Sequence, residues 1–128
     1  MKKILVLFTV LLTAFLFSPQ PADAQIRPKV KKEVTSQLEN RKTIIKNLGL
    51  RLANKLEVIA DKLENIAKRT GFKSPELEEE ITKSHTSIAQ AKEKFNSNNF
   101  KEGAKSIKES HLHLKNAHKI LRSHFANK

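Results

Sequence analysis

The chain has 128 residues, a formal net charge of +12 at pH 7 and no cysteine. The absence of cysteine excludes disulfides, thiolate metal centres, thiol catalysis and covalent haem attachment. The excess of 25 lysines and arginines over 13 acidic residues favours anionic partners, although charge alone says nothing about the fold.

The first 24 residues have the pattern of a secretory signal peptide. Lys2 and Lys3 precede an apolar run over residues 4–17, and prolines and small residues follow before Gln25. The run is shorter than the roughly 20 apolar residues that span a bilayer, and no lipid-accepting cysteine follows it. We therefore expect a signal peptide over residues 1–24 that is cleaved, a secreted or periplasmic location, and no transmembrane span in the mature protein.

Residues 25–32, with Pro28 and four basic residues, have the composition of a flexible basic arm. We expect the helical bundle domain over residues 33–128. Its first helix is predicted over about 33–70, because apolar residues recur there with a helical period and Gly71 then offers a left-handed cap.

Two further helices are predicted after Gly71. Ser74 followed by Pro75 is a strong helix start, and this second helix runs to about residue 95. The polar residues 96–99 predict a tight connection to a third helix that ends at about residue 125. The predicted fold is an all-α, antiparallel three-helix bundle with a long first helix.

Apolar residues at seven-residue spacing indicate which helix faces meet. Folding the helices back about the two turns places Leu56 and Ile88 in a central layer and brings Phe95 between Gly49 and Phe100. We also expect core positions along the main apolar row of the first helix, which consists of Leu38, Ile45, Leu52, Ile59 and Ile66.

The first helix overhangs the second by about 11 residues, or roughly 16 Å, so part of its apolar face lacks a partner. Either the helix breaks near Gly49 and Leu50 and its first segment folds back as a fourth helix, or the overhang docks on another molecule. A glycine inside a helix costs only about 1 kcal/mol and does not decide between them. The candidate protein-interaction residues are Leu38, Ile44, Ile45 and Leu48.

Catalytic and metal-binding patterns are weak. No two histidines of the third helix stand three or four residues apart, and only the hairpin register, which brings His85 near His111, leaves a weak two-histidine metal site open. The carboxylate cluster at residues 76–80 is explained by its place in the first turn of a helix. We therefore expect no enzyme and no cofactor, and we assign no metal ligand.

Two rows of basic residues recur every seven positions. The row on the third helix is Lys101, Lys108, Lys115 and Arg122, and the row on the first helix is Arg41, Lys55, Lys62 and Arg69. One interpretation is a solvated surface on which the methylene stems cover an apolar seam. The other is an extended contact with a polyanion.

These patterns predict a small, non-enzymatic binding protein that engages an anionic polymer or surface through its basic helix faces. Nucleic acid, an acidic envelope polymer and lipid headgroups are the candidate partners. The alternative is a structural or chaperone-like protein-interaction module that acts through exposed apolar helix ends, with a protein partner or by self-association. Salt separates the two, because polyanion binding weakens steeply with ionic strength and apolar docking does not.

Overall fold

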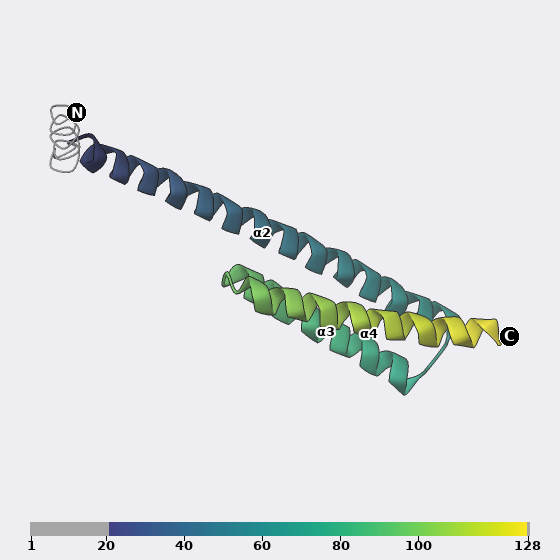
Figure 1. The fold of residues 1–128 in the computed structure, drawn as a ribbon. Coiled ribbons are helices and arrows are strands. Elements are labelled where there is room, and N and C mark those ends of the chain that lie inside the picture. Colours follow the sequence, from purple (N-terminus) through teal and green to yellow (C-terminus); the bar gives the residue numbers. More distant parts are fainter. Residues whose placement is uncertain (1–20, 128) are drawn as a thin grey trace, which may run out of the picture. The chain divides into compact units, whose positions relative to one another are not determined.

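The computed structural model describes residues 21–127, with side chains for residues 29–127. Over this range it contains three helices, α2 (Pro21–Thr70), α3 (Pro75–Asn96) and α4 (Phe100–Ala126), and no strand. The predicted all-α three-helix fold is therefore confirmed. The three helices pack together in the compact unit that begins at Asn40, where α2 lies beside α3 and α4 (Figure 1).

The N-terminal part of α2 differs from the sequence prediction. Residues 1–20, most of the predicted signal peptide, lie outside the described residues, and its cleavage stays a prediction. Residues 25–32 are helical, so the flexible arm expected there was wrong. Arginine and lysine have high helix propensity, and α2 continues through Pro28.

α2 also continues without a break through Gly49 and Leu50. The first segment therefore does not fold back as a fourth helix, and this alternative was wrong. The modest cost of one glycine is small beside the continuous hydrogen bonding of a 50-residue helix.

The two connections have the capping residues that the sequence indicates. Gly71 adopts a left-handed φ of 66°, and the amide of Phe72 donates to the Ala67 carbonyl at 3.1 Å. The Ser74 hydroxyl then accepts the Leu77 amide at 3.3 Å, with Pro75 at the first helical position. Both predicted boundaries are confirmed, and α3 and α4 are joined by only residues 97–99.

The core lies between all three helices. Two buried hydroxyls, Ser84 of α3 and Ser110 of α4, form a hydrogen bond of 2.9 Å, so these small polar residues meet without an unsatisfied atom. The buried apolar residues around them are Ala53, Leu56, Ala60, Leu63, Leu77, Ile81, Ile88, Leu114, Ala117 and Leu121. Leu56 and Ile88 are thus both in the core, as predicted.

Phe95 fixes the end of the bundle near the α3–α4 turn. Its ring centroid lies 6.4 Å from that of Phe100, and the ring lies against Gly49 of α2 and Gly103 of α4. A Cβ built at Gly49 would come within 3.0 Å of three ring atoms, whereas one at Gly103 would meet the ring at 3.1 Å. The glycines therefore allow two helices to approach the same ring, which confirms the predicted register.

The main apolar row of α2 is not in the core. Leu52, Ile59 and Ile66 are 51%, 44% and 42% exposed, so their predicted core positions were wrong. The alanines one residue further along, Ala53 and Ala60, are buried in their place. Small alanines let the helix axes approach closely, and the larger side chains are then left on the flank of α2.

Candidate functional site

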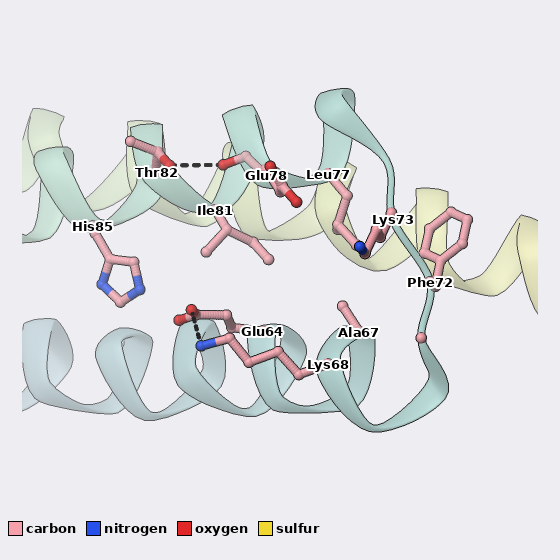
Figure 2. A pocket seen from close by; sticks show the side chains of 11 residues that line it. Glu64, Ala67, Lys68, Phe72, Lys73, Leu77, Glu78, Ile81, Thr82 and His85 are labelled. Carbon is pink, nitrogen blue, oxygen red and sulfur yellow. Dashed lines mark hydrogen bonds and ion pairs between the residues drawn. The ribbon is translucent and has the colours of Figure 1, made fainter.

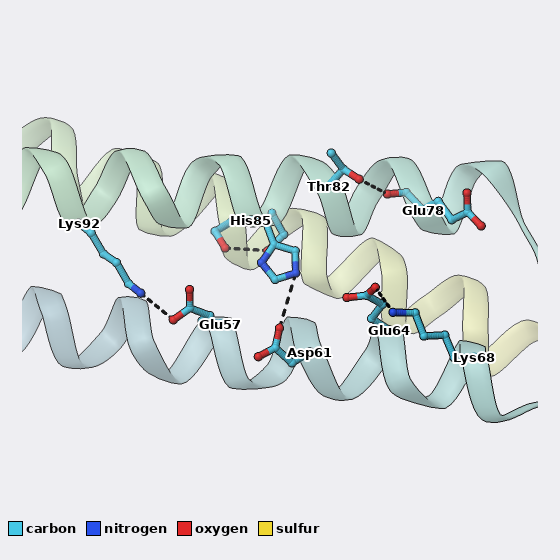
Figure 3. Close-up of polar contacts among 10 residues, drawn as sticks. Glu57, Asp61, Glu64, Lys68, Glu78, Thr82, His85 and Lys92 are labelled. Atoms are coloured by element: carbon cyan, nitrogen blue, oxygen red, sulfur yellow. Dashed lines mark hydrogen bonds and ion pairs between the residues drawn. The ribbon is translucent and has the colours of Figure 1, made fainter.

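The side of α2 that meets α3 has paired charges. Lys92 of α3 donates to the Glu57 carboxylate of α2 at 2.6 Å, and His85 Nε2 lies 3.8 Å from Asp61 Oδ1 (Figure 3). One turn further along α2, Lys68 pairs with Glu64 at 2.6 Å, and this hydrogen bond lowers the pKa of the Glu64 carboxyl. Glu57 and Glu64 thus each have a lysine partner, and Asp61 lies beside the imidazole of His85.

Asp61, Glu64 and His85 offer three donor atoms that all lie within 4.8 Å of one another. Two carboxylates and one imidazole suit a divalent ion such as Zn²⁺. However, Lys68 already neutralises Glu64, and the Asp61 side chain is exposed, so the cluster is explained by its own contacts. His111 is not in this group, and the suggested pairing of His85 with His111 gains no support.

A cavity of about 540 Å³ opens beside this cluster, near the α2–α3 turn (Figure 2). Its apolar wall is formed by Leu77, Ile81 and Phe72, and charged groups of both signs, including Lys68 and Glu78, stand around its mouth. This mixture of charges gives the cavity no preference for an anionic or a cationic ligand.

The α3–α4 side has one ion pair of note. Glu80 Oε2 lies 2.9 Å from His113 Nδ1 and also accepts from Asn116 at 3.2 Å. The hydrogen bond from His113 is the main reason that the pKa of the Glu80 carboxyl is lowered, and Asn116 adds to it. These contacts hold the start of α3 to the middle of α4.

The side of α2 that lies next to α4 is different. A hollow of about 440 Å³ between the two helices is lined by Ile66 of α2 and by His118, Arg122 and Phe125 of α4. Because residues seven apart lie within about 20° of one another around a helix, Ile59 and Leu52 extend this side of α2 back from Ile66. We call this surface the α2–α4 groove, and its floor consists of Leu52, Ile59, Ile66 and Phe125.

One member of each predicted basic row stands beside this groove. Arg122 lines the hollow directly, and the other members of its row precede it at seven-residue intervals on α4. On α2, Lys55 stands beside Val58 and Ile59 on the outer surface, so its row runs along the opposite edge. We call these rows the rims; they consist of Lys55, Lys62, Arg69, Lys101, Lys108, Lys115 and Arg122, all exposed.

No carboxylate lies along the groove among residues 40–127. The acidic residues of α2 in this range, Glu57, Asp61 and Glu64, are on the α3 side. On α4, Glu102 and Glu109 belong to the seven-residue row that ends at Asn116, the partner of Glu80 on α3. The rim cations have no ion-pair partner within the described part of the chain.

The remaining predicted residues are all on the exposed surface of α2. Arg41 is exposed, as are Leu38, Ile44, Ile45 and Leu48, the four candidate protein-interaction residues, which are 45–58% exposed. Ile45 precedes Leu52 in the same row and so continues the groove floor toward the start of the bundle unit. The sequence identified the two basic rows but did not place the apolar floor between them.

None of the described helices is both long enough and apolar enough to span a membrane. In comparisons with known proteins, no family model, no curated protein and no solved structure matches the chain.

Proposed function

We propose that this protein is a non-enzymatic binding protein that acts outside the cytoplasm and engages an anionic polymer or surface through the α2–α4 groove. The observation that supports this most directly is the separation of charge around the bundle. Glu57 and Asp61 of α2 lie against side chains of α3 and Glu64 pairs with Lys68, whereas the exposed rim cations have no ion-pair partner among the described residues.

Energetics favour the groove as the anion-binding surface. Cations that already have a carboxylate partner gain little from a second anion, because part of their field is neutralised. Unpaired cations that repeat at about 10.5 Å along a rigid helix can make several contacts with one extended anion and release its counterions together. The positive face also attracts such a partner from a distance at low salt.

The test compares two variants with the same change in net charge. Lys62→Gln with Lys115→Gln removes one cation from each rim, whereas Lys83→Gln with Lys94→Gln removes two cations that pair with Glu79 and Glu93 on α3. Binding to heparin and to a short DNA duplex is measured over a range of salt concentrations. We expect the rim variant to bind less tightly and its log–log salt slope to fall by about 1–2.

The control variant should keep both its affinity and its slope. Equal losses in the two variants would show that only net charge matters and would contradict the assignment of the groove. If the rim variant also binds both polyanions as tightly as the parent does, the anion-binding surface lies elsewhere on the molecule.

A second function, interaction with protein through apolar residues, is supported by the exposure of Ile44, Ile45 and Leu48. If the chain self-associates through them, Ile45→Glu yields a smaller species in sedimentation velocity runs, and this change persists at high salt. A parent that already sediments as a monomer would contradict self-association.

A further inference from the structure

The floor of the α2–α4 groove is apolar, and a polyanion alone gives no reason for this. Leu52, Ile59 and Ile66 are about half exposed and follow one another along α2 at intervals of about 10.5 Å, and Phe125 of α4 lines the same hollow as Ile66. Single exposed apolar residues are normal on a protein surface, but a row that repeats along one side of a helix beside unpaired charge is typical of an interaction site. The row with Ile45 included spans about 32 Å along α2.

We propose that the groove binds an amphipathic helix of a partner protein, with its apolar side on the floor and its acidic side chains on the two rims. This inference rests on the proposed function and deepens it by naming the partner. The partner helix would lie along α2 and α4 as an additional helix of the bundle and would need about 20 residues to cover the floor.

The shape of the surface supports a helix as the occupant. The hollow beside Ile66 and Phe125 lies between two helices, and the Arg122 side chain stands at its edge. A groove of this kind accepts side chains that project from a rod at three- and four-residue intervals. A bilayer surface would instead require apolar side chains that project beyond the cations.

Charge complementarity selects the partner's chemistry. Arg122 and Lys55 stand beside floor residues, further cations follow each of them at seven-residue spacing, and no carboxylate of residues 40–127 lies along the floor. An apolar helix flanked by glutamates or aspartates therefore gains attraction on both edges. A second copy of the groove would bring like charges together and is disfavoured. The chain's own acidic turn at residues 76–80 is also unsuitable, because Leu77 and Ile81 beside it are already buried.

The experiment uses the full mature chain and two synthetic peptides of about 20 residues. One peptide places leucines at helical spacing with flanking glutamates, and the other has the same composition in scrambled order. The chain variant Ile59→Ser with Ile66→Ser removes apolar side chains from the floor. The matched control, Val58→Ser with Leu112→Ser, changes residues that are 51% and 55% exposed and do not belong to the floor.

We expect the amphipathic peptide to bind at least about tenfold more tightly than the scrambled one, because only it can bury an apolar face. The floor variant should lose about tenfold or more in affinity for the amphipathic peptide while it keeps its affinity for heparin. The control variant should bind both as the parent does. Circular dichroism and thermal unfolding of each variant show whether it is folded.

Several outcomes would overturn the inference. Equal binding of the two peptides, or an unchanged affinity of the floor variant for the amphipathic peptide, would contradict the proposed partner helix. Either result would leave the proposed anion binding intact. Tighter binding to vesicles of anionic lipid than to the amphipathic peptide would make a membrane the occupant. A parent dimer that the floor variant dissociates would make a second copy the occupant. Binding to neither peptide nor heparin would contradict the proposed function itself.

Discussion

The two sides of α2 show how one helix can stabilise a fold and leave a surface for binding. Toward the core, alanines and leucines of α2 are buried, and on the α3 side its carboxylates Glu57 and Asp61 lie beside Lys92 and His85. On the α4 side, larger apolar residues stay half exposed and the cations have no acidic neighbours. The difference indicates that the ion pairs of α2 serve its packing on α3, whereas the rim cations are left for another partner.

The largest expected difference in the free energy of unfolding is between substitution of the core residue Leu56 and of the floor residue Ile59, three positions away. Leu56→Ala should lower the free energy of unfolding by about 2–5 kcal/mol, because it leaves a cavity among α2, α3 and α4. Ile59→Ala should cost less than about 1 kcal/mol, because the side chain is already half in water. Urea unfolding at neutral pH measures both, and similar costs would show that the floor is covered in the free protein.

Substitution of the two glycines beside Phe95 tests how closely α2 approaches the hairpin. Gly49→Ala should destabilise the fold by about 1–3 kcal/mol, because the new methyl group clashes with the ring. Gly103→Ala should change stability by less than about 1 kcal/mol, since its tighter contact is offset by the higher helix propensity of alanine. Thermal unfolding of the two variants gives the comparison, and a stable Gly49→Ala protein would mean that α2 and Phe95 are further apart.

The Glu80–His113 pair should make stability depend on pH. The pKa of the Glu80 carboxyl is lowered in the folded state, so its contribution is complete above the ordinary glutamate value of about 4.3 and is lost as the pH falls through the lowered value. Glu80→Gln should therefore cost about 1 kcal/mol at neutral pH and progressively less in acid. Urea midpoints from pH 7 down to pH 2 measure this, and a constant difference between the proteins would contradict it.

The smallest expected effect concerns the paired cations of the α3 side. In a double-mutant cycle, the pair between Lys92 and Glu57, which joins two helices and is partly buried, should have a coupling of about 0.5–1 kcal/mol. The more exposed pair between Lys68 and Glu64 should have about 0.3–0.5 kcal/mol. The order of the two values is the test, since a stronger coupling within α2 would mean that the interhelical pair does not hold α2 to α3.

Much of the fold was predictable because its signals are local. Gly71, Ser74 and Pro75 define the first turn by their own backbone preferences, and the second turn follows from a short polar segment. The register of α3 on α4 was also predictable, because the turn fixes which residues face each other, as Phe95 and Phe100 do.

The flank of α2 that enters the core was not predictable from the same pattern. A seven-residue row of large apolar residues and a neighbouring row of alanines have the same period, and spacing alone does not say which one faces the partners. The close approach of the helices around Gly49 and Ala53 decides this, and it depends on all three helices at once. For the same reason, the basic rows were visible in the sequence but the apolar floor between them was not.

The order of the helices along the chain has a consequence for its synthesis. α2 leaves the ribosome first, and the partners of its buried face, such as Leu114 and Leu121, are made last. The three-residue link lets α3 and α4 pair with little loss of loop entropy once both exist, so we expect α2 to dock onto a hairpin that has just been completed. Until that moment the nascent chain carries a long helix with apolar residues on two flanks, and this is the form that holdases and proteases meet first.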